Sequence, residues 1–431
     1  MRRQEQPRAG RPPTEADLAG RAAGLRAEVQ RVVAGIPVLD IHTHLYDPAL
    51  GALLLWGIDE LLVYHYLVAE TFRHGCGRVG SEFWRLSKTA QADLVWRTLF
   101  QENSPLSEAC RGVLTTLHRL GLDAHQRDLP ALRRWFAGWK VEAYVDRCLE
   151  LAGVRGVVMT SSPFDELEGP AWLRGWRRDS RFQAALRIDP LLLNWPVAAR
   201  QLAEWGYRVR ADLGATTRGE VRRFLADWSR RLQARYLMVS LPPDFQYPAR
   251  AASARLIEQV VLPHCQESGL PFALMLGVRR AVNPALQLAG DGVGSSDLAA
   301  LANLCAAHAG NKFLVTVLAR ENQHELCVLA RKFPNLHIFG CWWFTNVPVL
   351  VEEITRLRVE LLGLSFTAQH SDARVLDQVI YKWDHARAVV AQVLADEYVR
   401  LAATGWTPAP RDIERDAQQV FGGAFERFCR G

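Results

Sequence analysis

Two histidines one residue apart close the first apolar run of the chain. His42 and His44 stand in the segment Asp40-Ile41-His42-Thr43-His44. Residues two apart in a β-strand point the same way, so both imidazoles would face one space, as two ligands of one metal ion must. Neutral imidazole is the commonest metal ligand and suits zinc. Two unrelated strand histidines are the alternative, because this spacing alone is a weak signal.

A carboxylate and a guanidinium follow the last apolar run, in the segment His370-Ser371-Asp372-Ala373-Arg374. If the first and last runs are neighbouring strands of a closed barrel, Asp372 lies beside the two histidines. Two imidazoles and one carboxylate leave a zinc position open for water or substrate, which is typical of a catalytic site. Arg374 could bind a substrate carboxylate through paired hydrogen bonds. An aspartate that caps the following helix, beside a surface arginine, is the alternative.

The elements that must position these residues are eight short apolar runs that alternate with stretches of helical periodicity. This βα alternation indicates a parallel sheet, and eight such units most simply close into an α/β fold, the (β/α)₈ TIM-like barrel. The active site of that barrel forms at the C-terminal strand ends, where the polar residues of these runs stand. The predicted strands are 38–45, 156–163, 182–190, 236–242, 271–278, 312–319, 336–344 and 363–372.

The interval between the first two predicted strands is too long for one crossover helix. Residues from about 50 to 150 have helical patterns almost throughout, so we expect a helical insertion that leaves the barrel over the active-site mouth. A packing appendage without a catalytic role is the alternative. Residues 1–20, rich in Pro, Arg and Gly, predict a mobile tail, which leaves 21–431 as a single barrel domain.

Composition excludes several classes of protein. The 431 residues include 52 Lys and Arg against 46 Asp and Glu, for a net charge of +6, but the basic residues are scattered and form no nucleic-acid footprint. No run of 18 apolar residues occurs, which predicts that nothing spans a membrane. The eight cysteines lie far apart without a C-x-x-C pair, as free thiols in a reducing compartment do. We therefore expect a soluble cytoplasmic protein; the candidate site residues, and not the composition, point to an enzyme with a small-molecule substrate.

Beyond these patterns, the chain resembles the uronate isomerases (glucuronate isomerases) of the amidohydrolase superfamily. The resemblance implies a distorted (β/α)₈ barrel, a divalent metal that is usually zinc, and aldose–ketose isomerisation of hexuronates such as D-glucuronate or D-galacturonate. It also suggests a homo-oligomer, although no interface pattern is visible in the sequence. The motifs that carry it are DIHTHL (40–45), DELLVYHYLVAE (59–70), MTSSPFDEL (159–167), LRIDP (186–190), the segment 277–297, FGCWWF (339–344) and SDAR (371–374).

The resemblance also implies roles for individual residues. Asp372 would collect the C2 proton, with Tyr66 as its partner, while His65 or the metal polarises the carbonyl. Arg187 and Arg374 would hold the C6 carboxylate. The metal ligands implied are His42, His44 and Asp372, and the substrate-binding residues are Arg187, Arg374, Trp342 or Trp343, and, by a weaker alignment, Asp244.

Departures from the family pattern indicate a divergent member and keep two rivals open. Met275 stands where the family has a fifth-strand histidine, and Lys382 lies in the segment 381–387 where the family is strongly basic. One rival is a metal-dependent hydrolase of the same superfamily. Against it, the fourth, fifth and sixth runs lack the Lys or Glu and the histidines that such hydrolases use. The other rival is a barrel that binds a sugar acid without turnover.

Overall fold

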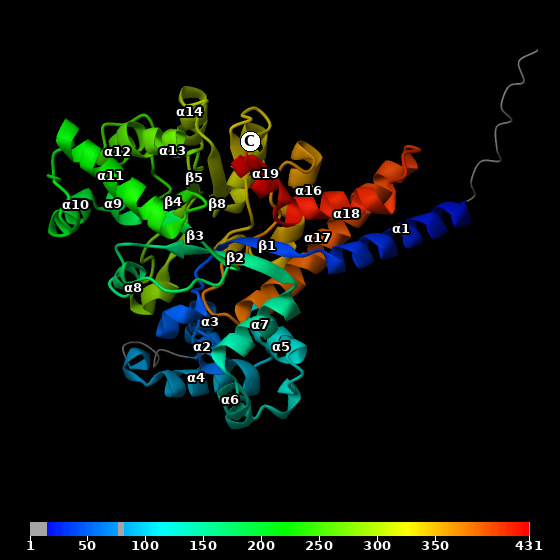
Figure 1. The fold of residues 1–431 in the computed structure, drawn as a ribbon. Coiled ribbons are helices and arrows are strands. Elements are labelled where there is room, and N and C mark those ends of the chain that lie inside the picture. Colours follow the sequence, from blue (N-terminus) through cyan, green and yellow to red (C-terminus); the bar gives the residue numbers. More distant parts are fainter. Residues whose placement is uncertain (1–14, 76–81, 431) are drawn as a thin grey trace, which may run out of the picture.

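The computed structural model describes residues 15–75 and 82–430. Its centre is a curled sheet of seven parallel strands in the order β1-β2-β3-β4-β5-β8-β9 (Figure 1). The first seven predicted runs each overlap one of these strands, although β2 begins two residues before its predicted run. They are β1 (Val38–Thr43), β2 (Val154–Ser161), β3 (Phe182–Arg187), β4 (Leu237–Leu241), β5 (Phe272–Leu276), β8 (Phe313–Val317) and β9 (Leu336–Ile338).

Helices cover the sheet, which explains why its strands are apolar along most of their length. In β1, β4, β5, β8 and β9 every residue is buried, as expected for a parallel sheet covered on both faces. The helices that follow or flank the strands are α8 (Glu168–Arg174), α9 (Asp189–Leu193), α10 (Trp195–Glu204), α11 (Ala215–Leu232), α12 (Ala252–Leu256), α13 (Leu262–Ser268), α14 (Ala299–Ala307), α15 (Gln323–Ala330), α16 (Pro348–Leu362) and α17 (Gln378–Ala403).

The eighth predicted strand, 363–372, is not a strand. In its middle, Thr367 forms a single β-bridge with Phe339, the residue directly after β9. The Thr367 amide donates to the Ile338 carbonyl at 3.0 Å. Its end bonds to β1, since the Asp372 amide donates to the His42 carbonyl at 3.1 Å. Between these points there is no ladder: the Ala368 amide donates to the Val420 carbonyl, and the amides of His370 and Ser371 donate to side-chain oxygens. Asp372 then turns into the left-handed region at φ 53°, which ends any extended conformation.

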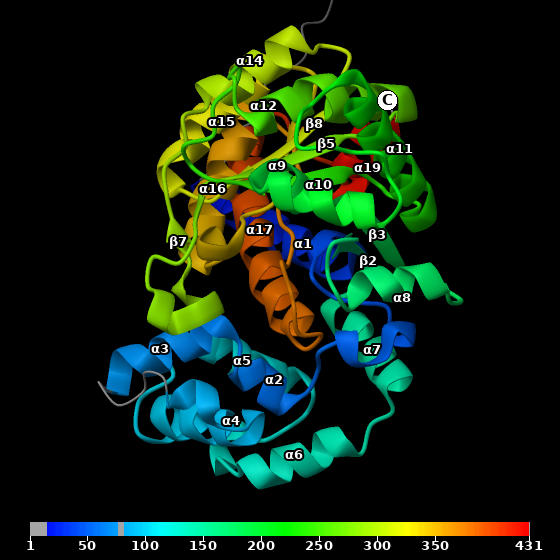
Figure 2. The same cartoon turned by 90° about the vertical axis from the view of Figure 1, so that its left-hand side faces the viewer.

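The segment between β1 and β2 contains helices and turns. Its helices lie together at one side of the molecule, below the sheet in both views (Figures 1 and 2). Polar side chains cap the starts of three of them; the Ser107 hydroxyl, for example, accepts the Cys110 amide at 3.1 Å at the start of α5. The helices are α2 (Ile58–Leu62), α3 (His65–Gly75), α4 (Lys88–Trp96), α5 (Glu108–Arg119), α6 (Leu129–Ala137) and α7 (Val141–Ala152).

The ends of the chain pack as helices beside α17. Of the predicted N-terminal tail, residues 1–14 lie outside the described residues and 15–20 begin helix α1 (Glu15–Gly35), which packs against α17. Helices α18 (Pro410–Gln418) and α19 (Ala424–Arg430) complete the chain. No helix among the described residues is long and apolar enough to cross a membrane. The described cysteines are free thiols, and Cys76 lies outside the described part.

Candidate active site

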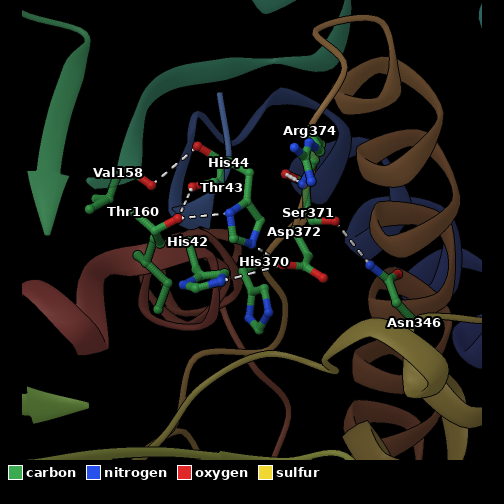
Figure 3. Close-up of polar contacts among 12 residues, drawn as sticks. His42, Thr43, His44, Val158, Thr160, Asn346, His370, Ser371, Asp372 and Arg374 are labelled. Atoms are coloured by element: carbon green, nitrogen blue, oxygen red, sulfur yellow. Dashed lines mark hydrogen bonds and ion pairs between the residues drawn. The ribbon is translucent and has the colours of Figure 1, made fainter. Parts of the chain in front are cut away.

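His42, His44 and Asp372 converge at the C-terminal end of β1. Asp372 Oδ1 lies 3.3 Å from His42 Nε2 and 3.4 Å from His44 Nε2 (Figure 3). Zinc bonds to nitrogen and oxygen are about 2.0–2.2 Å long, so neighbouring ligand atoms of a tetrahedral ion lie about 3.3–3.5 Å apart. Both distances from Asp372 match those between ligands of one metal ion, and the three ligand atoms all lie within 4.8 Å of one another. Among the described residues this is the one group of three or more His, Cys, Asp or Glu residues with that property.

Asp40 sets the register between the histidines and the aspartate. Its carboxylate is fully buried; Oδ1 accepts the Ser371 amide at 3.0 Å and Oδ2 accepts the Trp383 indole N–H at 2.8 Å. One side chain of β1 thus holds both the segment that carries Asp372 and the start of α17. Burial raises the pKa of Asp40, while these hydrogen bonds oppose the rise. The aspartate of the DIHTH motif therefore has a structural role: it joins β1 to the Asp372 segment and to α17.

Thr160 on β2 orients His44. The Thr160 hydroxyl lies 3.0 Å from His44 Nδ1 and 3.1 Å from the Thr43 carbonyl oxygen (Figure 3). A hydroxyl has one proton, so when Thr160 donates it to the carbonyl, its oxygen accepts the Nδ1 proton of His44. That tautomer leaves Nε2 of His44 as a free base directed at Asp372. Two acceptors facing each other at this distance need a cation between them, which is what a metal ion supplies.

Burial and neighbouring groups fix the protonation of these groups. Burial lowers the pKa of His44 to about 4, so its imidazole is neutral near pH 7. For Asp372, burial alone would raise the pKa, but the neighbouring imidazoles of His42 and His44 hold it well below its ordinary value. A neutral imidazole and an ionised carboxylate are the forms that bind metal.

A cavity of about 130 Å³ opens in front of this cluster, with room for a small molecule. Arg187 at the end of β3 lines it and pairs with Asp189 at 2.9 Å. Arg374 also lines it, and in the described residues it has no carboxylate at ion-pair distance. The guanidiniums of Arg187, at the end of β3, and of Arg374, in the loop before α17, therefore line one small cavity with the metal-ligand cluster, as does that of Arg280. The lining residues are His42, His44, Tyr64, His65, Arg187, Met238, Ser240, Arg280, Leu288, Asp291, Trp342, Trp343, Asp372 and Arg374.

A uronate isomerase from Bacillus halodurans is similar to this chain. The two are 49% identical over 95% of this chain and 97% of the other, with a TM-score of 0.93. The chain belongs to the uronate isomerase family. Two further structures share the fold at lower identity. A uronate isomerase from Thermotoga maritima is 15% identical, with a TM-score of 0.77 over 94% of this chain and 97% of the other. A glucuronate isomerase from Caulobacter crescentus is 16% identical, with a TM-score of 0.67 over 97% of this chain and 95% of the other. No family model and no curated protein matches the chain.

The structure brings together most of the residues expected from the uronate isomerase resemblance. His65, at the start of α3, lines the cavity beside Trp343, with ring centroids 5.5 Å apart, and burial lowers its pKa to about 3. Trp342 and Trp343 both line the cavity. Trp343 has φ 47°, a strained backbone for a bulky residue and one that is typical of functional sites.

Two expected residues lie elsewhere. Asp244 is exposed in the turn after β4 and does not line the cavity. Tyr66 lies one layer behind the cavity wall, where its hydroxyl is buried without a hydrogen-bond partner in the described residues. Tyr64 lines the cavity instead, with its ring 5.0 Å from that of Tyr66. The sequence signal for Tyr64 was its place in the same Tyr-His-Tyr triplet.

Arg280 and Asp291 are the charged lining residues that sequence reasoning missed. They lie at the two ends of the loop that joins the hairpin strands β6 (Val278–Arg279) and β7 (Gly292–Val293), and they form an ion pair with each other. The segment 277–297 had been noted for its motif alone, and a motif does not say which of its side chains turns inward. This loop contacts the helical segment between β1 and β2, where Trp84 donates its indole N–H to the Ala285 carbonyl at 2.9 Å.

The departures from the uronate isomerase pattern have different locations. Met275 is buried in an apolar cluster with Met238 and Ala273 and does not line the cavity, so it serves packing. Lys382 is buried on α17 close behind Tyr66. The ring of His370 lies 5.0 Å from that of His42, and neither of its nitrogens has a hydrogen-bond partner in the described residues (Figure 3). It is not one of the three converging ligands.

Proposed function

We propose that this chain is an aldose–ketose isomerase that interconverts a hexuronate and its keto form. The observation that carries the proposal is the convergence of a metal-ligand triad and two guanidiniums on one small cavity. A small acid with a carbonyl next to a hydroxyl-bearing carbon fits this cavity, and an open-chain hexuronate is such a molecule. The names of the similar proteins, uronate and glucuronate isomerase, support this substrate class.

His42, His44 and Asp372 would hold a divalent metal, with zinc our proposal for its identity. The fit rests on three observations: the mutual distances of the three ligand atoms, the unpartnered Asp372 Oδ1, and the tautomer of His44 that Thr160 favours. When bound, such an ion polarises a carbonyl or hydroxyl oxygen and stabilises negative charge there.

Arg187 and Arg374 would bind the C6 carboxylate and so orient the other end of the sugar toward Asp372. Each charge-assisted hydrogen bond contributes about 1.5–3 kcal/mol. Asp189 holds the Arg187 guanidinium, while Arg374 has no competing carboxylate partner in the described residues. Positioning of this kind is a large part of catalysis in a reaction that only moves protons.

Asp372 would remove the C2 proton, because its ionised carboxylate faces the cavity and its depressed pKa keeps it a base near neutral pH. An enediol forms, and a proton returns to C1. Tyr66 and His65 would handle the proton at the neighbouring oxygen, although Tyr66 reaches it only past Tyr64. The indole rings of Trp342 and Trp343 narrow the cavity on the side that faces His65.

Two further proposals concern the complete fold and the cellular compartment. The seven-stranded sheet, together with the bonded segment 363–372, would form a distorted (β/α)₈ barrel, with the helical segment 48–153 as an insertion beside its mouth. The free, mostly buried cysteines fit a reducing compartment such as the cytoplasm.

The hydrolase alternative receives less support. Ser240 is the one polar side chain that β4 directs into the cavity, and Met275 and Leu318 are packed in an apolar cluster. Among the described residues there is thus no second set of ligands for the binuclear or lysine-bridged site that such hydrolases build. Incubation of metal-analysed protein with a panel of hexuronates, followed by proton NMR, is the test. Ketose formation supports isomerisation; silence across the panel, with turnover of an ester, amide or lactone, contradicts it.

A further inference from the structure

Lys382 is a buried amine without a counter-charge. The residue is 2% exposed, and its Nζ has no hydrogen-bond partner among the described residues. No described carboxylate lies within 4.0 Å of it. A buried ammonium without a paired carboxylate loses several kcal/mol of hydration free energy, so proteins rarely keep one without a reason.

Two aromatic rings take the place of a carboxylate. Lys382 Nζ lies 5.3 Å from the centroid of the Tyr66 ring and 5.5 Å from that of Tyr381. Both distances are within the range of a cation–π interaction, which strengthens when the groups are desolvated. The amine therefore sits between α17, which carries Lys382 and Tyr381, and α3, which carries Tyr66.

Tyr66 connects this amine to the cavity. Its ring lies 4.4 Å from that of His65 and 5.0 Å from that of Tyr64, and both of these residues line the cavity. The Tyr66 hydroxyl is buried without a partner in the described residues. A charge at Lys382 thus stands directly behind the residues that would handle the second proton of the reaction.

We propose that Lys382 is a positioning residue for the isomerisation: its ammonium holds the Tyr66 ring in place and stabilises the negative charge on the Tyr66 oxygen when that hydroxyl gives up its proton. The proposal rests on the proposed function. In this step the O–H bond of Tyr66 breaks as its proton passes to the oxygen of Tyr64, which lines the cavity and gives its own hydroxyl proton to the substrate oxygen on C1. The Tyr66 phenolate stays beside the ammonium until the proton that leaves the C2 hydroxyl returns by the same path. No electrons change hands.

The electrostatic surroundings of Tyr66 support a need for this charge. Burial raises the pKa of Tyr66 well above its ordinary value, and the neighbouring acids and phenols raise it further. Burial also lowers the pKa of Lys382, while Glu108, Asp372 and Asp40 oppose that effect. Several titratable groups face Tyr66. Tyr64 and His65 are its neighbours in the chain, and Asp372 lies in the segment before α17. The others are Tyr381 and Lys382 on α17 and Glu108 on α5.

The test places 3-fluorotyrosine at position 66 and follows its ¹⁹F resonance with pH, in proteins with Lys382 and with Lys382→Met. We expect the fluorotyrosine pKa to be higher by about one in Lys382→Met, a tenfold weaker acid. Lys382→Arg keeps the charge and is expected to keep the titration. Lys312→Met is the matched control, because Lys312 bonds to the Cys429 carbonyl near the start of β8, away from the cavity. An equal pKa in the Lys382 and Lys382→Met proteins overturns the proposal.

Kinetics give a second readout. We expect Lys382→Met to lower kcat roughly tenfold with KM unchanged, less than the 10²–10⁴-fold of a direct acid or base, and to add nothing in a Tyr66→Phe background. Full additivity overturns the proposal. If Lys382→Met does not fold, the pKa of Lys382 is measured by ¹³C NMR in the wild type and in Tyr66→Phe. An equal Lys382 pKa in the two proteins overturns the proposal. Absence of isomerase activity in the wild type refutes the proposed function, but the ¹⁹F comparison still decides the coupling.

Discussion

The two ends of the sheet hold hollows of opposite character. Near the starts of β8 and β9 lies one of about 960 Å³, and at the C-terminal end lies one of about 130 Å³. At the large hollow the buried polar side chains are paired: Asn311 with the Leu262 carbonyl, His337 with the Thr367 hydroxyl, and Asp416 with the Tyr398 hydroxyl. At the small one, His42, His65, Trp343 and Asp372 each keep a buried polar atom without a hydrogen bond.

Volume therefore does not locate the site, whereas unpaired polar groups do. An unpaired buried donor or acceptor costs about 1–3 kcal/mol, and a protein keeps several together only where a ligand completes them. The same division between a stabilising and a catalytic end is general for barrels of this kind.

Removal of a metal ligand should have the largest effect. We expect His42→Ala to lose its bound metal and to lower kcat on the order of 10³-fold, because the ion stabilises the charge on the reacting oxygen. His337→Ala is the matched control: it removes an equally buried imidazole from the other end of the sheet. It should keep its metal content and turnover. Metal analysis by mass spectrometry with parallel hexuronate kinetics checks both, and full metal and turnover in His42→Ala would break the comparison.

Loss of the unpaired guanidinium comes next. We expect Arg374→Met to lower kcat/KM by roughly 10- to 100-fold, since about 1.5–3 kcal/mol of charge-assisted hydrogen bonding to the C6 carboxylate is lost. Steady-state kinetics on a hexuronate measure it. Arg331→Met, at the large hollow, serves as control and should be silent. An effect of equal size in both variants would mean that net charge, and not the site, is responsible.

The orienting threonine should have a smaller effect. We expect Thr160→Val to weaken metal binding roughly 10-fold, at the low end of what such supporting hydrogen bonds contribute, because His44 loses the group that fixes its tautomer. Competition with a chromogenic chelator measures the affinity. Unchanged affinity would show that β1 alone orients His44.

The smallest effect on turnover at pH 7 should come from His337, although it affects acid stability. Burial lowers the pKa of His337 to about 3. Between pH 6.5 and 3 the unfolded chain binds a proton that the folded chain does not, so stability falls as the pH falls. Removing this group should reduce that slope by up to about 1.4 kcal/mol per pH unit. Urea denaturation of the wild type and His337→Gln between pH 7 and 4 measures the difference, and identical slopes would contradict the assignment.

Much of this arrangement follows from sequence pattern. Seven of eight runs contain strands because buried parallel strands are continuous apolar stretches, and His42 and His44 meet because alternation along a strand is a local rule. The eighth run failed because side chains compete with the ladder: Gln369 Oε1 accepts the Cys341 amide at 2.6 Å, and Asp40 takes that of Ser371. Periodicity does not reveal such substitutions.

The helical part of the site was less predictable. His65 was placed at the cavity, but Tyr66 lies behind it and Tyr64 in front, because the direction of neighbouring helical side chains depends on how the helix is docked. Lys382 was visible in sequence as a departure without a meaning. Its meaning depends on packing between α3 and α17, which are far apart in the chain.

Proton exchange at C2 of a hexuronate in D₂O tests the central claim most directly. Wild-type protein with its metal should exchange the C2 proton for deuterium during turnover, and Asp372→Asn should lose at least 10²-fold of that rate. Asp244→Asn, an exposed acid outside the cavity, should exchange at the wild-type rate. Undiminished exchange in Asp372→Asn would contradict the assignment of the base and, with it, the account of this site.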